Sequence, residues 1–375
     1  MKVLVTGAKG FLGKNLVSEL RNKNYQNVHQ IDRYTAPELL EDYCKNCDFI
    51  FHLAGVNRPE NPDEFMEGNH NVLADLLKIL KKHHNTCPVM LASSIQAVKD
   101  NPYGKSKKAA EDLLFSYSEE TGAEVYVYRF TNIFGKWCKP NYNSVIATFC
   151  YNIAHNLPIQ INNPDAKMKL AYIDDVVSEL IYAMEGHANK QKDGFCYVET
   201  LYTVTLREIV DMLYAFKKSR EKREIPDMTT GSFSKNLYST YLSYLSQNDL
   251  SYFLKMNVDE RGSFTEIFRT MDRGQFSVNI SKPGVIKGNH WHKTKNEKFI
   301  VVKGNALIKL REVGSETVME YHVNGEEIKV VDIPPGYTHA IMNVGNTDLI
   351  TFMWCNECYD PEISDTYFLE VEKDA

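Results

Sequence analysis

The sequence predicts two domains, a doubly wound α/β domain with a parallel sheet in residues 1–245 and an all-β domain in residues 252–371. Three observations support this division. A short apolar run, a glycine-rich turn and an amphipathic segment open the chain, and apolar runs then alternate with helical patterns. From Tyr252 onward the pattern changes to short alternating segments separated by glycine turns. At 375 residues the chain is also too long for one hydrophobic core.

The start of the chain has the pattern of a nucleotide-binding turn. A strand is expected over 2–6 and an amphipathic helix over 14–20, with a glycine-rich turn between them. Further strands are expected over 28–32, 48–53 and 89–93. Backbone amides at a helix N-terminus bind pyrophosphate, and glycines let it approach without Cβ clashes. The order of strand, glycine turn and helix therefore predicts a dinucleotide site.

The glycine spacing of this turn resembles that of the extended short-chain dehydrogenase/reductase family, whose members have a Rossmann-type sheet. Other segments typical of that family follow in order over about residues 1–240: His52–Gly55, Asn71-Val72, Ser93-Ser94, Tyr103–Lys107, Arg129–Gly135 and Tyr172–Val176. The resemblance implies that the cofactor is bound by Gly7, Lys9, Gly10, Phe11, Leu12, Gly13, Asp32, Arg33, Leu53, Ala54, Gly55, Asn71, Tyr103 and Lys107.

Tyr103 and Lys107 are four residues apart, so they share one face of a helix. We expect the ammonium to lower the pKa of the phenol, which is normally near 10. Tyr103 would then protonate the alkoxide that forms when hydride reaches a carbonyl carbon, while Ser94 holds the same oxygen by a hydrogen bond. The sequence therefore predicts a carbonyl reductase.

The choice between NADH and NADPH rests on conflicting residues. Asp32 ends the second predicted strand, where a carboxylate binds the ribose hydroxyls of NAD, whereas Lys9 and Arg33 suit the extra phosphate of NADP. We expect NADPH and keep NADH open. The family places a sugar nucleotide at the segment Trp137–Ser144, which its composition alone would equally fit as a surface loop. The expected substrate contacts are Asn132, Lys139, Asn141 and Asn143.

The second domain carries a histidine pattern typical of a metal site. His290 and His292 are two apart and leave one face of a strand, and Glu297 can return on the next strand. His339 follows a Pro-Pro-Gly turn, and antiparallel pairing would bring it against the first two histidines. Nitrogen and oxygen donors without thiolate suit a divalent metal such as Zn, Ni, Mn or Fe.

This spacing resembles the cupin family, which implies a cupin barrel. The first family motif is matched by Gly284, His290, His292, Glu297 and Gly304, and the second by Pro334, Gly336, His339 and Asn343. Ile328 stands where the family usually has glycine. This difference concerns the turn before the second motif and none of the four metal ligands.

A second resemblance, to deoxynucleotide-sugar 3,5-epimerases, covers Asp259–Glu266 and the segment over 275–289. It makes Arg261 and Glu266 further candidate substrate residues. Those epimerases use a histidine near the position of His290 as base. A histidine that binds a metal has no free lone pair, so the base remains unassigned.

Composition excludes several other classes. A net charge of -6 does not favour nucleic acid or an anionic membrane as a partner, and no apolar run reaches the length of a bilayer span. The first residues enter a strand directly and leave no room for a signal peptide, so we expect a cytoplasmic protein. The pairs Cys44/Cys47 and Cys355/Cys358 are interpreted as reduced thiols.

The order of the two domains resembles a family of bifunctional capsular polysaccharide synthesis enzymes. The resemblance implies a UDP-linked 2-acetamido-2,6-dideoxy-4-ketohexose as substrate, epimerisation at C3, reduction at C4, a zinc ion and a homodimer. The expected product is UDP-2-acetamido-2,6-dideoxy-L-talose, a precursor of UDP-N-acetyl-L-fucosamine. Two alternatives remain, a reductase with a structural dimerisation barrel and a dinucleotide-sensing regulator. The presence of both Tyr103 and Lys107 disfavours the regulator.

Overall fold

A computed structural model describes residues 1–229, 231–270 and 272–372. The chain forms two compact units. The first comprises Met1–Tyr214 and Gly231–Ser246, and the second comprises Ala215–Thr230 and Gln247–Ala375.

The first unit is built on a parallel sheet of five strands in the order β2-β1-β3-β4-β5. The strands are β1 (Lys2–Thr6), β2 (Asn27–Ile31), β3 (Phe49–His52), β4 (Val89–Ser94) and β5 (Val125–Phe130). Because β2 lies on one side of β1 and β3 on the other, the strand order reverses at β1. Ligands of such sheets bind at the carboxyl ends of the strands where this reversal occurs. The predicted Rossmann-type parallel sheet is confirmed.

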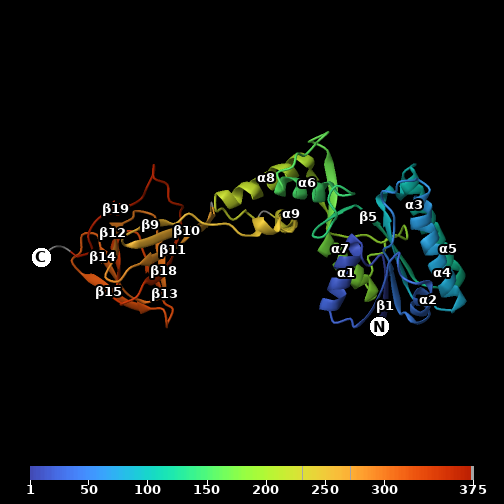
Figure 1. The fold of residues 1–375 in the computed structure, drawn as a ribbon, viewed down its shortest axis with the longest axis horizontal. Helices are drawn as coiled ribbons and strands as arrows, with labels where there is room; N and C mark the ends of the chain where they lie inside the picture. The colour runs from blue at the N-terminus through green and yellow to red at the C-terminus, as the bar shows by residue number, and fades with distance from the viewer. Residues whose placement is uncertain (230, 271, 373–375) are drawn as a thin grey trace. The chain divides into compact units, whose positions relative to one another are not determined.

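Helices cover both faces of this sheet (Figure 1). α1 (Phe11–Asn22) and α7 (Ile173–Met184) pack on one face, where Leu16 and Leu20 join Val3 and Val5 in a buried cluster. The other face is covered by α2 (Pro37–Asn46), α4 (Val72–Lys82) and α5 (Pro102–Thr121). Leucines spaced three and four apart give α4 its buried face. This packing fixes the strand ends on which the candidate site is built.

The remaining elements of the first unit surround the carboxyl ends of the sheet or extend from it. A short sheet has the order β6-β7-β8. The elements are α3 (Glu64–Met66), a π-helical turn (Glu67–Asn71), a 3₁₀ turn (Ile95–Val98), β6 (Asn132–Phe134), α6 (Val145–Ala154), β7 (Lys167–Tyr172), β8 (Tyr202–Thr205) and α9 (Ser232–Leu242). Helix α8 (Leu206–Glu221) begins in the first unit and ends in the second, and a 3₁₀ turn (Gln247–Leu250) opens the rest of the second unit.

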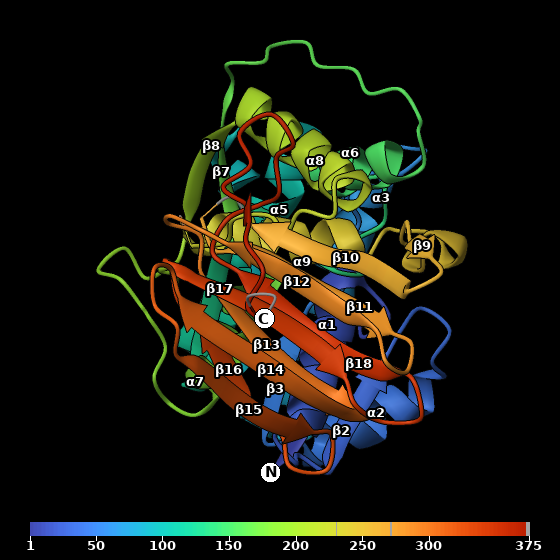
Figure 2. The ribbon, with the colours of Figure 1, turned by 90° about the vertical axis from the view of Figure 1, so that its left-hand side faces the viewer.

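The second unit contains two antiparallel sheets, whose strands are coloured from orange to red in Figure 2. Their orders are β16-β13-β18-β11-β10-β9 and β15-β14-β17-β12-β19. The strands are β9 (Asn257–Asp259), β10 (Gly262–Thr270), β11 (Gly274–Ser281), β12 (Ile286–Trp291), β13 (Glu297–Lys303), β14 (Asn305–Glu312), β15 (Val318–Asn324), β16 (Val330–Ile333), β17 (Tyr337–Asn343), β18 (Leu349–Cys355) and β19 (Tyr367–Phe368).

An apolar cluster fills part of the space between these sheets, with Phe299 and Val301 from β13 against Ile308, Leu310 and Ile341. The predicted all-β class is confirmed. The closed barrel is not confirmed, because the strands of the described chain pair into two separate sheets.

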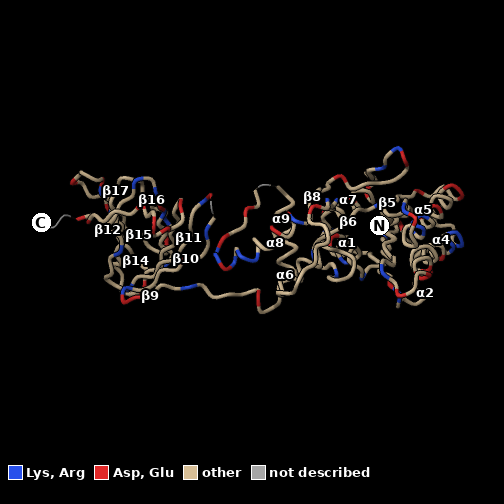
Figure 3. The backbone as a smooth tube through the Cα atoms, turned by 90° about the horizontal axis from the view of Figure 1, so that it is seen from above, with Lys and Arg blue, Asp and Glu red and all other residues tan. Residues whose placement is uncertain are grey.

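Basic and acidic residues are interspersed along the backbone of each unit (Figure 3). Among the residues that the structure describes, no helix combines the length and apolarity needed to cross a bilayer.

A buried ion pair in the first unit joins α5 to the sheet, and its removal should lower the stability of the chain. Glu111 is fully buried, and Arg129 of β5 donates to its two oxygens at 2.9 and 2.6 Å. Arg129→Met leaves a buried carboxylate unpaired and should cost about 3–5 kcal/mol of unfolding free energy. Urea unfolding followed by circular dichroism measures this loss of unfolding free energy.

The exposed pair of Arg207 with Asp165 provides the control, since Arg207→Met should change the unfolding midpoint little. Equal effects of the two substitutions would contradict the assignment of Arg129 and Glu111 as a structural pair.

Candidate functional site

The glycine turn lies against the loop that follows β3. Gly7 has a φ of +67°, and a Cβ there would lie 2.7 Å from the backbone nitrogen of Ala54. Thr6 accepts a hydrogen bond from that same nitrogen at 3.3 Å, and its hydroxyl also lies 3.1 Å from Nδ1 of the buried His52. Gly10 is the N-cap residue of α1. The structure thus brings the predicted turn together with the predicted segment over 53–55 at the start of a helix.

The residues with conflicting implications for the cofactor bind one another. The Lys9 ammonium forms an ion pair with Asp32. This hydrogen bond, with one from the backbone of Tyr34, lowers the pKa of Asp32. The Arg33 guanidinium lies 5.4 Å from the centroid of the Tyr34 ring. Lys9 and Asp32 are therefore neighbours at the carboxyl end of the sheet. A ligand bound beside one of them would also meet the charge of the other.

Ser94, Tyr103 and Lys107 come together where β4 ends and α5 begins. The Ser94 hydroxyl is hydrogen-bonded to the Tyr103 phenol, and Lys107 Nζ lies 5.9 Å from the centroid of the Tyr103 ring. Lys107 is 6% exposed and donates to the Ala92 carbonyl at 3.0 Å. Ser94, Tyr103 and Lys107, which the sequence predicts to act on the same carbonyl, therefore lie in one cluster.

The expected lowering of the Tyr103 pKa is wrong for this arrangement. Burial raises the pKa of Tyr103, and the bond with Ser94 offsets only part of that effect. Burial also lowers the pKa of Lys107 to about 8. The amine is bonded to a carbonyl rather than to the phenol oxygen, so desolvation of the phenol exceeds any stabilisation of its anion.

A buried asparagine that the sequence analysis missed supports this cluster. Asn69 is 1% exposed, exchanges two hydrogen bonds of 3.0 Å with the backbone of Val56, and donates to Ser106 at 3.0 Å. Gly55 lies against Asn69 and Lys107. The predicted cofactor residue Asn71 is exposed and bonded to His70. The π-helical turn over Glu67–Asn71 turns Asn69 inward, a rotation that helical periodicity does not predict.

Of the predicted substrate residues of the first unit, Asn132 begins β6, and the other three lie on the exposed loop that follows this strand. Tyr244 anchors this loop by donating to the Cys138 carbonyl at 2.5 Å. Lys139 Nζ lies 5.3 Å from the centroid of the Tyr142 ring. Four side chains remain open to solvent: Asn132, Lys139, Asn141 and Asn143.

The four predicted metal ligands converge in the second unit. Strand β12 pairs with β17 so that His290 lies opposite His339, as the antiparallel prediction required. His292 follows the end of β12, and Glu297 begins β13. One ligand atom from each residue lies within 4.8 Å of the others. The set is the one that the motif spacing indicated.

The electrostatics of this cluster suit a cation. Nε2 of His292 and both ring nitrogens of His339 are buried without a hydrogen bond among the described residues. Burial, then the neighbouring His339, lower the pKa of His290 to about 4, which leaves its ring neutral at neutral pH. Burial alone would raise the pKa of Glu297, but His292, His339 and Lys295 hold it well below its ordinary value. Neutral imidazoles and a carboxylate are the form in which these groups bind metals.

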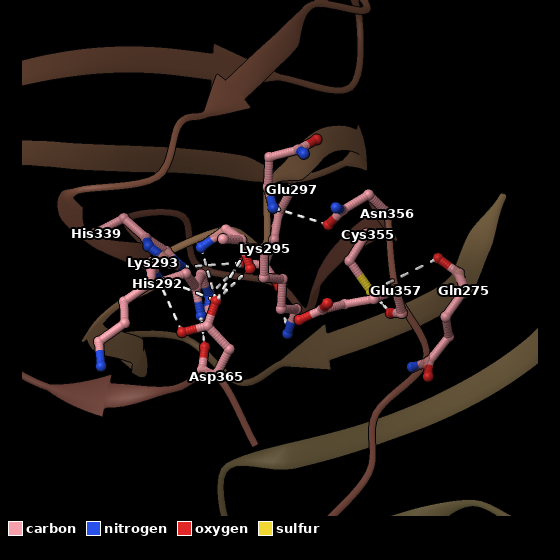
Figure 4. Close-up of polar contacts among 12 residues, drawn as sticks. Gln275, His292, Lys293, Lys295, Glu297, His339, Cys355, Asn356, Glu357 and Asp365 are labelled. Carbon is pink, nitrogen blue, oxygen red and sulfur yellow. Dashed lines mark hydrogen bonds and ion pairs between the residues drawn. The ribbon is translucent and has the colours of Figure 1, made fainter. Parts of the chain in front are cut away.

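Asp365, near the C-terminus, is a neighbour of the cluster that sequence reasoning missed (Figure 4). The His292 ring bonds through Nδ1 to the main-chain carbonyl of Asp365. The Asp365 carboxylate accepts from the backbone nitrogens of Lys293, Thr294 and Lys295 at 2.8–3.1 Å. The bond to Nδ1 leaves Nε2 of His292 directed toward Glu297, 3.5 Å away. The spacing motifs end before residue 365 and give no signal for this contact.

A bulge in β12 places Lys287 on the same face as His290. The register shifts between Gly288 and His290, Gly288 has a φ of +118°, and a Cβ there would lie 2.5 Å from the His339 carbonyl oxygen. Lys287 lies opposite the buried Ile341 and donates to Asn279 of β11 at 2.7 Å. Its side chain therefore spans the space between the two sheets.

The buried face of β11 around Lys287 is polar. It carries Gln275, Ser277, Asn279 and Ser281, each at most 4% exposed. Thr351 of β18 lies opposite Asn279, and its buried hydroxyl has no hydrogen-bond partner among the described residues. Rows of buried polar groups are unusual in an apolar core and are common where a polar ligand binds.

The two candidate substrate residues of the second unit are both in ion pairs. Arg261 is exposed and forms bonds of 2.6 and 3.0 Å with Asp259. Glu266 is 8% exposed and binds Arg269, with Arg223 3.4 Å away. Glu266 therefore joins β10 to the segment around Arg223.

The fold and the cluster at the end of β4 define a dinucleotide-dependent enzyme that acts on a carbonyl or alcohol. The NAD dependent epimerase/dehydratase family matches residues 3–195, more than half of the 375 residues, and the chain belongs to this family. The Polysaccharide biosynthesis C-terminal domain matches residues 257–367.

Full-length relatives are known. The chain is 43% identical over 375 residues to the UDP-2-acetamido-2,6-beta-L-arabino-hexul-4-ose reductase of Pseudomonas aeruginosa, covering 100% of both chains. It is 54% identical to the capsular polysaccharide assembling protein CapF from Staphylococcus aureus, with a TM-score of 0.93 and coverage of 99% of this chain and 100% of that one. The predicted whole-chain resemblance to capsular polysaccharide enzymes is confirmed.

The buried Lys107 should give stability a distinct pH dependence. Its pKa is about 8 in the folded chain and 10.5 ordinarily, so between these values the unfolded chain holds more protons and stability rises with pH. The unfolding free energy of wild type minus that of Lys107→Met should therefore increase by roughly 3 kcal/mol from pH 8 to 10.5. Urea unfolding at several pH values measures this difference.

Lys105→Met, on the exposed side of the same helix, is the matched control and should give a flat difference. A flat difference for Lys107→Met as well would show that its ammonium is not desolvated.

Proposed function

We propose that the chain is a bifunctional nucleotide-sugar enzyme of capsule or surface polysaccharide biosynthesis. The first unit reduces the C4 ketone of a UDP-linked 2-acetamido-2,6-dideoxy-4-ketohexose, and the second unit, a cupin, inverts C3. The product is UDP-2-acetamido-2,6-dideoxy-L-talose. The observation that carries the proposal is the grouping of Ser94, Tyr103 and Lys107 beside a glycine turn, in a chain that matches a hexulose reductase over its whole length.

When bound, NADPH would be the hydride source for reduction at C4. Negative charge then develops on the C4 oxygen, and Tyr103 donates its phenolic proton to it while Ser94 donates a hydrogen bond. The raised pKa of Tyr103 supports this role, because the phenol stays protonated at neutral pH. Lys107 is largely charged below a pH of about 8 and favours proton transfer from the neighbouring phenol.

The residues around the turn fit a dinucleotide. The backbone amides of Gly10, Phe11 and Leu12 open α1 and would bind the pyrophosphate. Gly7 and Gly13 let the turn pack closely against the segment over 53–55 and the start of α1. Lys107 would reach the nicotinamide ribose. Lys9 and Arg33 would bind the 2′-phosphate of NADPH and free Asp32 from its ion pair with Lys9. NADH would instead be held through Asp32.

The donor set of the second unit fits one divalent metal, with zinc the preferred ion. Such an ion would act as a Lewis acid that stabilises negative charge on the C4 oxygen during epimerisation. His290, His292, His339 and Glu297 would hold it. The buried ring nitrogens of His292 and His339 that have no hydrogen bond among the described residues support this assignment.

Lys287 is our candidate for the epimerase base. Burial lowers the pKa of Lys287, which favours the neutral amine. Its Nζ is hydrogen-bonded to Asn279 Oδ1 and to the Ile280 carbonyl, both of them uncharged. The amine would take the C3 proton while the electrons of the C–H bond move toward the C4 oxygen. A proton from solvent would then be delivered to the opposite face of C3, which inverts the centre, and the Lys287 ammonium would return its proton to solvent. Lys287 leaves His290 free to serve as a metal ligand.

One ketone explains both activities. The C4 carbonyl acidifies the hydrogen at C3, and the same carbonyl accepts the hydride. Reduction removes that acidity, so the configuration set at C3 is retained in the product. Epimerisation must therefore precede reduction.

The reductase assignment predicts a specific effect of Tyr103→Phe. Loss of the phenolic proton donor should lower kcat for ketosugar reduction by about 10²–10⁴-fold. Binding of NADPH, followed by fluorescence titration, should stay within a few-fold of wild type. Tyr182→Phe, at an exposed tyrosine, is the control and should leave both unchanged. Retention of full activity by Tyr103→Phe would exclude Tyr103 as the proton donor.

The epimerase assignment is tested separately, with UDP-linked 6-deoxy-4-ketohexosamine in deuterated water without NADPH. Deuterium should enter C3 with wild type and with Tyr103→Phe, and its entry should fall at least about 100-fold in Lys287→Met and His290→Ala. Mass spectrometry and NMR follow the sugar.

Exchange that persists in Lys287→Met would place the base elsewhere. A wild type that reduces the ketone but never exchanges C3 would instead support the alternative in which the second unit is a structural dimerisation module.

A further inference from the structure

The C-terminal part of the described chain, residues 365–372, is bound to the elements that carry the candidate metal ligands. We call it the C-terminal strap. Its first residue, Asp365, contacts His292 and the three backbone nitrogens that follow it. Its next residues form β19, which pairs with β12 so that Phe368 lies opposite His290 and Tyr367 opposite Trp291. The strap thus reaches both histidines of the first motif.

The Asp365 carboxylate organises the loop between His292 and Glu297. Three consecutive backbone N–H groups, those of residues 293–295, point at one carboxylate, and the Thr294 hydroxyl adds a fourth bond at 3.2 Å. Such a set of donors fixes the backbone of the whole loop. Because the loop carries a ligand at each end, its conformation sets the separation of His292 and Glu297.

The main-chain carbonyl of Asp365 fixes the orientation of His292. Histidines that bind metals through one ring nitrogen commonly donate from the other to a carbonyl or carboxylate, which sets the tautomer. The Nδ1 contact of His292 with Asp365 has this form. It keeps the Nε2 lone pair available on the side of Glu297 and His339.

The far end of the strap is anchored independently of these contacts. The buried Arg311 donates to the carbonyls of Glu370 and Val371 at 2.6 and 2.7 Å. The Leu369 nitrogen donates to the Asn289 carbonyl at 3.0 Å, and the Thr338 hydroxyl donates to the Leu369 carbonyl. Thr338 precedes His339 in β17. The strap therefore holds β12 and β17 together beside the metal ligands.

We propose that Asp365 is a positioning residue for the metal centre, and that the C-terminal strap holds the ligands in their binding arrangement before the metal enters. The inference rests on the metal centre of the proposed function. In this proposal the strap contributes to metal affinity separately from folding. Arg311 anchors the far end of the strap, and its hydrogen bonds described above involve none of the metal ligands.

The test compares Asp365→Asn and Asp365→Ala with wild type in the full-length protein. Metal content per chain and competition between the protein and a chromophoric chelator for Zn²⁺ give the affinity, and thermal unfolding of metal-stripped protein gives the stability. Both variants should bind Zn²⁺ about 10–100-fold more weakly, because they release the loop over 293–295 that sets the separation of His292 and Glu297. The unfolding midpoint of the stripped protein measures separately what these bonds contribute to folding. Thr294→Val, which removes one bond to Asp365, should weaken affinity in the same direction by less.

Asp360→Asn is the matched control, since Asp360 is also in the C-terminal segment and its side chain accepts a bond from the backbone of Glu362 in its own loop. It should leave affinity unchanged. Zn²⁺ affinities of the Asp365 variants within two-fold of wild type would overturn the inference, whether or not their stability falls. A wild type that binds no Zn²⁺ would overturn the metal centre itself, which distinguishes the two failures.

Discussion

The register of β12 against β17 determines the chemistry of the second unit. A shift of one residue would turn every side chain of β12 to the opposite face. The observed register sets His290 opposite His339, and the bulge after Gly288 lets Lys287 share their face. The Gly288 backbone can approach the His339 carbonyl because it has no Cβ. The ligand cluster and the candidate base depend on this pairing because β12 carries His290 and Lys287. The strap depends on it because β19 pairs with the same strand.

In the first unit the comparable constraint is the burial of Lys107. Its ammonium is enclosed by β4, Gly55 and Asn69, and its single hydrogen-bonded partner among the contacts described above is the Ala92 carbonyl. A buried ammonium with few acceptors is costly, which is why its pKa falls. The same desolvation keeps the nearby Tyr103 phenol protonated. Burial therefore supplies a neutral acid and a cation that are both suited to a developing alkoxide.

Much of the fold could be predicted, because its determinants are local. Strand ranges such as 2–6 and 89–93 agree with β1 and β4 to within one residue, since apolar runs bounded by glycine and polar residues define them. The ligand set was predictable because spacing along a strand fixes which side chains share a face. Motif spacing also indicated Ser94, Tyr103 and Lys107, although their pKa values depend on burial that no local pattern describes.

The residues that were missed act through distant or irregular backbone. Asn69 turns inward on a π-helical turn, and Lys287 turns inward through a bulge, so neither follows the regular period of its element. Asp365 lies 73 residues from His292 and contacts it through a main-chain carbonyl, which leaves no side-chain signature. The closed barrel was implied by the cupin resemblance and is not confirmed, because the spacing of ligand motifs carries no information on whether the edges of two sheets pair.

The ligand cluster has an energetic consequence for folding. Buried ring nitrogens without hydrogen bonds destabilise a folded chain, and three such atoms lie in His292 and His339. A bound cation would offset this cost, because it binds the folded arrangement and not the extended chain. The strap reduces the remaining cost by ordering the loop over 293–295 through backbone bonds that do not require the metal. The second unit can therefore keep a preformed site in the absence of metal. A metal that binds this site adds its free energy of binding to the free energy of unfolding.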